Sequence, residues 1–590
     1  MKGFVLAGTG SGVGKTSIAT GLMSRLSKTM EVQAFKAGPD FIDPMYHAAA
    51  TGRPSRNLDS FLMDDETIRN LAGYASKGSD ICVVEGVRGL FEGFSGDGDM
   101  GSTAYVAKLL GLPVILVVDA RSLTRSAAAI VNGFRSFDPG VRIAGVILNN
   151  VSGPQHAGKL KVAFESYCPG VRVVGMIPKS PGKALEQRYL GLKTLKTFAE
   201  REITPLQELA EPIDLDAVMD IAESSEVELP DSSPYHERSC GLKAAVPMDD
   251  AFCFYYRENI ECLEASGFDV RTFRPVDGDP LPEADLYYLG GGYPELHASA
   301  ISENTDFLEG LKTEAENGKT VIGECGGLMS MCRSIEDKDG NVHRMAGIFD
   351  AEARMTGIRH GPTYVIADAA PGNPAFGGTV RGHEYHYSDV FPSGRPVYGF
   401  DVRRGRGIAD SMDGLVSGRC IGSYMHQHAL SEKDWIGTAV GNILSGRRRH
   451  GSGGILRRGP RGVLRLHLRS GLLRHPGQVH RASPAGGPRA RSGVRIVQGR
   501  PRFHGPGVRR GPGRCVGGHA QGGQGEAGDR CRADAVRGAA VRRGVQRRMG
   551  QRIAAPCPVG RSPPDPLAHP QGHEAGRRLL LLVQDRGLRG

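Results

Sequence analysis

A glycine-rich segment near the start of the chain has the residue types of a phosphate-binding loop. Residues 8–16 read GTGSGVGKT and directly follow a short apolar run. Glycines let backbone N–H groups converge on phosphate oxygens, and a helix that begins at the loop adds positive potential. Lys15 would reach the β- and γ-phosphates of a nucleotide, and Thr16 would hold Mg²⁺. The predicted nucleotide-binding residues are Gly12, Gly14, Lys15 and Thr16. Thr9 occupies the position where such loops usually have their first glycine.

Carboxylates recur where predicted strands of the same region end. Asp40 and Asp43 lie in the segment KAGPDFIDP (residues 36–44), and Glu85 closes the apolar run 81–84. In α/β folds such positions lie near the phosphate loop, so the three carboxylates and Thr16 are predicted to bind a metal or a phosphorylated intermediate. Asp119 also ends a predicted strand, but a local helix cap or loop role is the simpler interpretation there.

A cysteine lies at the apex of a predicted strand–turn–helix element. Residues 323–329 read GECGGLM, which places Cys325 between glycines as a G-x-C-x-G elbow. The turn would expose the sulfur and direct it at a helix N-terminus, an arrangement that lowers the pKa of a thiol. Cys325 is therefore predicted to be a nucleophile, whereas the other ten cysteines need no such role.

Two other segments complete this candidate site. Residues 290–295 (GGGYPE) end a predicted strand, and the backbone N–H groups of Gly291 and Gly292 could form an oxyanion hole. Residues 421–428 (IGSYMHQH) supply a base, either His426, which we favour, or His428, since alternate residues of a strand share one face. No acidic residue follows His428 directly, so a third, orienting member is not evident.

Two α/β regions must position these residues. Near-continuous apolar runs alternate with helical stretches in residues 1–200, which predicts a doubly wound parallel sheet. A polar stretch at 201–242 is predicted to be a linker, and a second α/β pattern occupies 243–445. The predicted strands are Gly3–Gly8, Glu31–Ala37, Ile81–Glu85, Pro113–Asp119, Val141–Asn149, Val171–Ile177, Lys243–Met248, Phe268–Phe273, Ala284–Leu289 and Lys319–Gly323.

Charge is distributed unevenly along the chain. Residues 446–590 contain 31 arginines, no lysine and six acidic residues, so their net charge is +25, which leaves −15 for residues 1–445. This Arg/Gly/Pro-rich composition fits a nucleic-acid arm, a disordered tail, or the translation of GC-rich DNA in a wrong frame, which we favour because lysine is absent. Either of the last two predicts no stable core, and we assign this tail no function.

The remaining features of the composition indicate in which compartment the protein works and which partners it has. The eleven cysteines show no CxxC pattern, which favours a reducing compartment over a disulfide framework. No apolar run approaches the roughly 20 residues of a membrane helix, and no signal peptide is recognised. We therefore expect a cytoplasmic protein with neither nucleic acid nor membrane among its partners.

These segments together resemble the cobyrinate a,c-diamide synthase family, most closely its archaeal branch, which includes nickel-sirohydrochlorin a,c-diamide synthase. The resemblance extends in order over about 420 residues and has no counterpart to the tail. In the family's segment EGVxGLFDG, this chain has Arg88 at the variable position and Glu92 in place of aspartate. The matching segments are 8–16, 36–47, 57–59, 85–93, 252–256, 290–295, 323–328, 381–388 and 423–428.

The resemblance implies an N-terminal domain similar to dethiobiotin synthetase and a C-terminal class I glutamine amidotransferase domain. It implies that Cys325 is the nucleophile, that His426 is its base, and that Asp40, Asp43 and Glu85 serve Mg·ATP and an acyl phosphate. The reaction would be ATP-dependent amidation of the a- and c-acetate carboxylates of a tetrapyrrole polycarboxylate, with L-glutamine as nitrogen donor.

Alternatives remain at this stage. A cobyric acid synthase-like ligase would amidate other corrin carboxylates, and a non-catalytic nucleotide switch would use the phosphate loop alone. The sequence does not distinguish a cobalt corrin, as in cobalamin synthesis, from nickel-sirohydrochlorin, as in coenzyme F430 synthesis. It also leaves the oligomeric state open, with a homodimer as one option.

Overall fold

The computed structural model describes residues 1–179, 200–225, 227–431 and 435–451. The described residues all lie in one structural unit, Met1–Leu473. Of the predicted tail, only the start falls within the described residues; the remainder, and with it the expectation of an unstructured tail, lies outside them.

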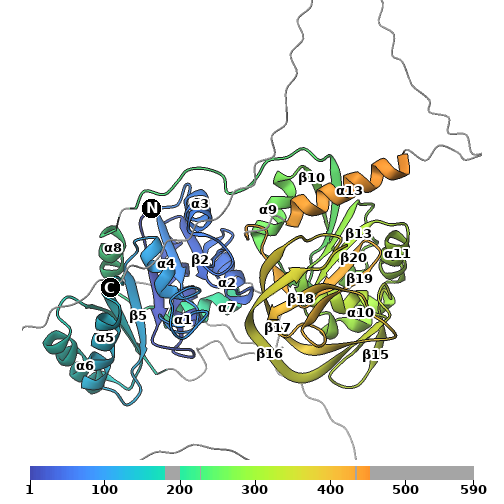
Figure 1. The fold of residues 1–590 in the computed structure, drawn as a ribbon. Helices are drawn as coiled ribbons and strands as arrows, with labels where there is room; N and C mark the ends of the chain where they lie inside the picture. Colours follow the sequence, from blue (N-terminus) through green and yellow to red (C-terminus); the bar gives the residue numbers. More distant parts are fainter. Residues whose placement is uncertain (180–199, 226, 432–434, 452–590) are drawn as a thin grey trace, which may run out of the picture. The chain divides into compact units, whose positions relative to one another are not determined.

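The first half of the unit is built on a seven-stranded sheet in which neighbouring strands are parallel (Figure 1). Its order is β3-β2-β4-β1-β5-β6-β7. The predicted strands of this half agree with the structure within two residues, and only the short β3 was not predicted. The strands are β1 (Gly3–Gly8), β2 (Val32–Ala37), β3 (Arg56–Leu58), β4 (Ile81–Glu85), β5 (Val114–Asp119), β6 (Ile143–Val151) and β7 (Arg172–Pro178).

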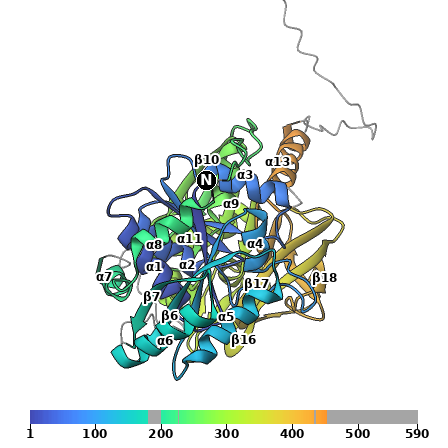
Figure 2. The same ribbon diagram turned by 90° about the vertical axis from the view of Figure 1, so that its left-hand side faces the viewer.

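Helices cover the sheet because its central strands are mainly apolar and β1, β2 and β4 are buried along their whole length, with Gln33, Lys36 and Glu85 as polar exceptions. The helices are α1 (Lys15–Leu26), α2 (Ile42–Thr51), α3 (Asp65–Ala75), α4 (Thr103–Leu109), α5 (Arg125–Phe137), α6 (Pro154–Tyr167), α7 (Glu200–Leu209) and α8 (Leu215–Glu223). The last two lie in or overlap the segment predicted as a linker. Helix α7 packs against α1, as Figure 2 shows, and α8 buries Val218 and Ala222 in the same core.

The second half contains a mixed twelve-stranded sheet. Parallel pairing joins β10-β8-β11-β13-β20, and antiparallel strands continue it through β19, β18 and β16. Two long strands, β16 (Ala351–Ala369) and β17 (Thr379–Pro392), pair with each other and curve through this half (Figure 1). The others are β8 (Leu242–Pro247), β10 (Phe268–Phe273), β11 (Leu286–Leu289), β13 (Thr320–Glu324), β14 (Ser334–Glu336), β15 (Val342–Arg344), β18 (Tyr398–Arg404), β19 (Met412–Ser417), β20 (Cys420–Ser423) and β21 (His426–Gln427).

Short elements and helices complete this half. Strands β9 (Phe252–Phe254) and β12 (Gly291–Gly292) form a separate antiparallel pair. Helices are α9 (Arg257–Ala265), α10 (Ala298–Glu303), α11 (Thr305–Glu316), α12 (Gly326–Met331) and α13 (Trp435–Gly451). Helix α13 runs past residue 445, where the second domain was predicted to end, and Trp435 at its start is only 2% exposed. Within the described ranges, no helix has the length and apolar character needed to cross a membrane.

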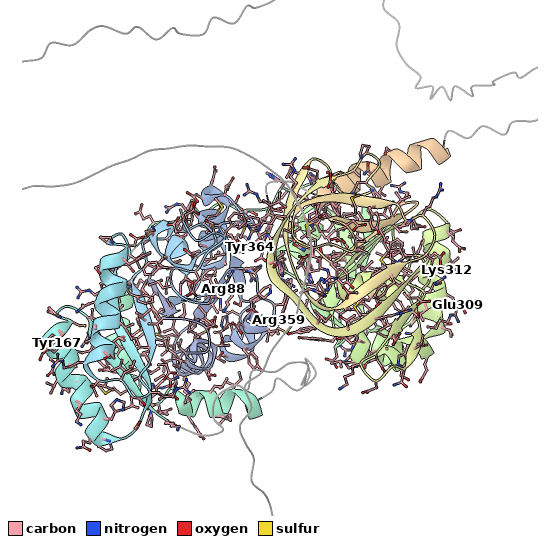
Figure 3. The ribbon with its side chains drawn as sticks, turned by 60° about the horizontal axis from the view of Figure 1, so that its bottom comes forward. Arg88, Tyr167, Glu309, Lys312, Arg359 and Tyr364 are labelled. Atoms are coloured by element: carbon pink, nitrogen blue, oxygen red, sulfur yellow. The ribbon has the colours of Figure 1, made fainter. Side chains whose placement is uncertain are left out.

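Buried polar contacts connect the two halves. Arg56 of β3 binds Glu261 of α9 with both Nη atoms, at 2.7 and 2.9 Å, and lies 3.5 Å from Glu258. The hydroxyl of Tyr364, labelled in Figure 3, donates to Asp59 Oδ2 at 2.9 Å. Each contact joins charged or polar groups that are largely shielded from water. Each of these groups therefore depends on its partner in the other half for a hydrogen bond or ion pair.

Candidate functional site

The phosphate loop has the predicted strand–loop–helix geometry. Strand β1 enters it, and Gly14 precedes α1 with φ of 97°, a left-handed conformation that glycine adopts without strain. Lys15 folds back so that Nζ donates to the carbonyl of Gly10 at 2.9 Å. Burial, with Lys36 nearby, lowers the pKa of Lys15. The loop thus presents backbone N–H groups and one ammonium group to a bound anion.

Thr16, Asp43 and Glu85 converge beside the loop as predicted. Thr16 Oγ1 donates to Glu85 Oε1 at 2.7 Å and lies 3.2 Å from Asp43 Oδ2. Lys36 bridges the two carboxylates, with Nζ 2.5 Å from Asp43 and 3.1 Å from Glu85. Burial alone would lower the pKa of Lys36, but the two carboxylates outweigh it and raise that pKa. His47 Nε2 lies 2.6 Å from the other oxygen of Glu85.

Neither Lys36 nor His47 was singled out in the sequence analysis, although Lys36 opens the segment 36–44 that carries Asp40 and Asp43, and His47 follows soon after its end. Burial would raise the pKa of Glu85, but Lys36 and His47 outweigh burial and hold it below its usual range. Burial and the neighbouring Glu85 raise the pKa of Asp43. A carboxylate kept ionised beside a lysine suits a site that must receive a cation and a phosphate together.

The donor set fits Mg²⁺ bound with a nucleotide. Among the described residues no cluster of three His, Cys, Asp or Glu side chains is arranged to hold a metal ion alone. Mg²⁺ commonly takes only one or two carboxylates and completes its shell with phosphate oxygens and water. The oxygens of Thr16, Asp43 and Glu85 match that need. Asp40 differs, because its Oδ1 accepts from the backbone N–H groups of Ile42 and Asp43 and so shapes the turn.

Cys325 lies at the predicted elbow between β13 and α12. Its backbone has φ 49° and ψ −100°, a strained conformation for a residue with a side chain. The backbone N–H of Cys325 donates to the carbonyl of Ser423 at 2.7 Å, which fixes the turn against β20. The Gly326 N–H points at the sulfur and favours its thiolate. The elbow therefore holds the sulfur in one place at the end of a buried strand.

The expected lowering of the thiol pKa is wrong for this state of the protein. Burial, with Glu295 nearby, raises the pKa of Cys325 to about 12. The side chain is 6% exposed, so loss of hydration outweighs the backbone N–H of Gly326 and the start of α12. A base must therefore remove the proton when substrate binds.

Of the two predicted base candidates, His426 lines the same cavity as Cys325, as do His383 and His386. The His426 ring stacks on His383 with centroids 4.9 Å apart, and its Nδ1 lies 3.5 Å from Glu324 Oε2. His428 does not line that cavity: its Nε2 lies 3.5 Å from Glu258, and its ring packs on Tyr256. The geometry favours His426 as the base.

Glu324 is a site residue that the sequence reasoning missed. It is 2% exposed, and its Oε1 accepts weakly from the backbone N–H of Gln427 at 3.3 Å. No acidic residue follows His428 directly, whereas Glu324 directly precedes the cysteine. Its position before an elbow residue was the available signal.

The Gly291–Gly292 strand lies between the elbow and the histidine. A Cβ atom added to Gly291 would be 2.4 Å from Cε1 of His426, and one added to Gly326 would be 3.1 Å from the backbone N of Gly292. Side chains at these positions would collide with the site. The strand therefore brings backbone groups close to Cys325, as an oxyanion hole requires.

One cavity of about 370 Å³ contains residues of both predicted sites. Asp119 does not line it and instead pairs with Arg121. The residues of the first half that line the cavity include Gly12, Lys15, Thr16, Lys36, Asp40, Phe41, Asp43, Glu85 and Arg88; those of the second half include Gly292, Glu295, Cys325, His383 and His426.

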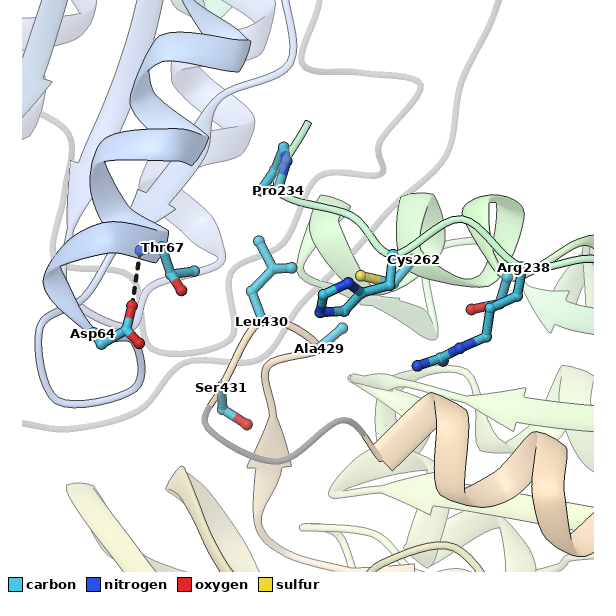
Figure 4. A pocket seen from close by; sticks show the side chains of 10 residues that line it. Asp64, Thr67, Pro234, Arg238, Cys262, Ala429, Leu430 and Ser431 are labelled. Carbon is cyan, nitrogen blue, oxygen red and sulfur yellow. Dashed lines mark hydrogen bonds between the residues drawn. The ribbon is translucent and has the colours of Figure 1, made fainter. Parts of the chain in front are cut away.

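A second cavity, of about 220 Å³, lies elsewhere (Figure 4). Cys262, Arg238 and Leu430 line it, together with Asp64, which accepts from the backbone N–H of Thr67 at 2.8 Å. Its described lining includes none of the predicted site residues. Asp64 caps helix α3, so its role is accounted for by the fold.

Comparisons with known proteins match both halves. Residues 4–188 match the CobQ/CobB/MinD/ParA nucleotide binding domain, and residues 243–434 match the CobB/CobQ-like glutamine amidotransferase domain. The chain is 45% identical over 439 residues to the cobyrinate a,c-diamide synthase of Methanothermobacter thermautotrophicus, which covers 72% of this chain and 96% of that protein. It is 43% identical over 449 residues to the protein of that name from Methanocaldococcus jannaschii, covering 75% and 99%.

Proposed function

The chain belongs to the cobyrinate a,c-diamide synthase family and carries out glutamine-dependent amidation, and from this premise we propose that it is an ATP-dependent ligase acting on the a- and c-acetate carboxylates of a tetrapyrrole. The substrate is cobyrinate, nickel-sirohydrochlorin or both. The observation that supports this most is the single cavity lined by Lys15 of the phosphate loop and by Cys325 of the elbow. A nucleotide switch would need no such cysteine there.

The second half supplies nitrogen. His426 removes the proton of Cys325, and the sulfur attacks the carboxamide carbon of glutamine. The backbone of Gly291 and Gly292 stabilises the oxyanion, and collapse of the tetrahedral intermediate releases NH₃ with the proton that His426 returns. Water then cleaves the thioester to give glutamate and restores the thiol.

The first half activates the carboxylate. An oxygen of the tetrapyrrole carboxylate attacks the γ-phosphorus of ATP, which gives an acyl phosphate and ADP. Lys15 stabilises charge on the transferring group. Mg²⁺, held by Thr16, Asp43 and Glu85, would neutralise phosphate charge when bound. NH₃ then attacks the acyl carbon and phosphate leaves, and repetition on a second carboxylate gives the diamide.

Two further cavity residues suit the proposed ligands. Arg88 is exposed and forms no ion pair with any other described residue, so it can bind a tetrapyrrole carboxylate. Figure 3 labels Arg88. Glu295 lines the cavity together with Cys325 and can accept from the α-ammonium of glutamine. Glu92, by contrast, accepts from the backbone N–H of Gly89 and so closes its own turn.

Reconstitution tests the proposal. The purified chain is incubated with ATP, Mg²⁺, glutamine and either cobyrinate or nickel-sirohydrochlorin, and products are identified by mass spectrometry and by NMR assignment of the amidated side chains. Amides on the a- and c-acetates are expected, with ADP formed in step. Amides confined to other side chains would support a cobyric acid synthase-like activity instead. No amide from either substrate, with glutamine or with ammonia, would refute the proposed ligase.

A further inference from the structure

Phe41 of the first half contacts the histidine site of the second half. Its ring centroid lies 5.0 Å from that of His426 and 5.4 Å from that of His383. It also lies 4.7 Å from the Tyr256 ring and stacks on Phe254 at 5.3 Å with an interplanar angle of 9°. These rings surround the proposed base, so Phe41 helps to define where the imidazole lies.

The same short turn carries groups of the phosphate site. Phe41 lies between Asp40 and Asp43, and Asp43 contacts Thr16 and Lys36. Asp40 Oδ1 accepts from the N–H groups of Ile42 and Asp43 at 2.9 and 3.0 Å, which makes the turn a closed unit. A displacement of Asp43 by an arriving ligand therefore moves the backbone that carries the Phe41 ring.

We propose that Phe41 is a positioning residue that couples occupancy of the phosphate site to glutamine hydrolysis at Cys325. The ring already lies against His426, and a ligand in the phosphate site would hold the turn, and with it the imidazole, in this arrangement for proton transfer. The ring also lines the cavity through which NH₃ must pass, so it shields the passage beside His426 from solvent. This role rests on the proposed function, because coupling has meaning only if both reactions occur.

The test compares Phe41→Ala with the full-length chain in its unaltered form. Three quantities are measured: glutamate formed per amide, the stimulation of glutamine hydrolysis by ATP plus tetrapyrrole, and amidation driven by ammonium chloride without glutamine. The unaltered chain is expected to form about one glutamate per amide. In the variant this ratio is expected to rise about fivefold, because loss of one aromatic contact changes an equilibrium constant by about that factor. Stimulation by ligands is expected to fall by a similar factor, while ammonia-driven amidation persists.

Two other variants separate coupling from packing. Phe41→Tyr retains the ring and is expected to restore the glutamate-to-amide ratio. Phe94→Leu also alters a contact between the halves, since Arg404 of the second half lies 4.0 Å over the Phe94 ring, but Phe94 is not part of the cavity lining. It is expected to leave the ratio unchanged.

An unchanged ratio in Phe41→Ala, with ammonia-driven amidation intact, would overturn the inference. So would the same rise in Phe94→Leu, because the effect would then come from the interface in general. If Phe41→Ala does not fold, Phe41→Leu is measured in the same way. Absence of amidation in the unaltered chain, with glutamine and with ammonia alike, would instead refute the proposed function and is recognised before any variant is made.

Discussion

Glu324 and His426 face each other across the elbow, with Glu324 Oε2 3.5 Å from His426 Nδ1. Both side chains are 2% exposed, so their interaction is little screened by water. The carboxylate beside His426 thus comes from the strand that precedes the cysteine, and the segment that supplies the histidine has none. Although His426 Nδ1 makes no hydrogen bond in this arrangement, a carboxylate in this position favours the imidazolium that forms during proton transfer.

Replacing Glu324 by glutamine is expected to lower kcat for glutamine hydrolysis about 10²-fold, within the range that general-base catalysis contributes. Ammonia-driven amidation should remain, because it does not use His426. The matched control is Glu258→Gln, which alters the carboxylate 3.5 Å from His428. Equal losses in both variants would argue that His428, or packing alone, accounts for the effect.

Cys325→Ala is expected to abolish glutamine-dependent amidation and to retain activity with a high concentration of ammonium chloride. The physical reason is that ammonia replaces only the product of the thiol chemistry. Lys15→Ala should lose both activities, because the acyl phosphate can no longer form. A folded Cys325→Ala protein that is inactive with ammonia would contradict this division of labour.

The affinity for glutamine is expected to depend on pH through Glu295. Burial raises the pKa of Glu295 to about 7. Below this value the side chain is neutral and cannot pair with the α-ammonium of glutamine; above it the carboxylate forms. KM for glutamine should therefore decrease as the pH is raised from about 6 to about 8. The variant Glu295→Gln should keep a high KM that does not change across this range. A pH-dependent KM that persists in the variant would exclude Glu295 as the cause.

Arg88→Gln is expected to raise KM for the tetrapyrrole about 10- to 100-fold, the loss typical of one charge-assisted contact. KM for glutamine should not change. Arg121→Gln provides the control, because Arg121 is exposed and pairs with Asp119 outside the cavity. An unchanged tetrapyrrole KM in Arg88→Gln would move the carboxylate-binding role to other residues.

Removal of residues 452–590 is expected to leave activity and Tm unchanged, because the Arg/Gly/Pro-rich composition offers little apolar surface for a core. Removal of residues 435–590 should lower the free energy of unfolding by roughly 3–5 kcal/mol or more, as loss of a buried large side chain does. Trp435 and Ile436 are 2% and 1% exposed. Thermal unfolding of both truncated proteins measures the difference, and lost activity in the shorter deletion would show that the tail contributes.

The sequence predicted those parts whose signal is local. Parallel strands such as β1 and β4 are continuous apolar runs, and the elbow at Cys325 is marked by its own glycines. Strand β16 is harder to predict because residues 356–359 are exposed and interrupt the alternation of buried positions along it. The stretch predicted as a linker contains α8 and nearly all of α7, which were not predicted as helices because their polar faces obscured the apolar residues that pack on α1 and the sheet. The thiol pKa depends on burial, which no local pattern encodes.

The ion pair of Arg56 with Glu258 and Glu261 also bears on how such chains are divided or recombined. Separating the gene after the first sheet would open this contact to water, where the guanidinium and the two carboxylates would be hydrated, so each half would lose the contact without keeping an unpaired buried charge. A chimaera that combines halves from two relatives would need an arginine at position 56 in the first half and its carboxylate partners on α9 in the second half.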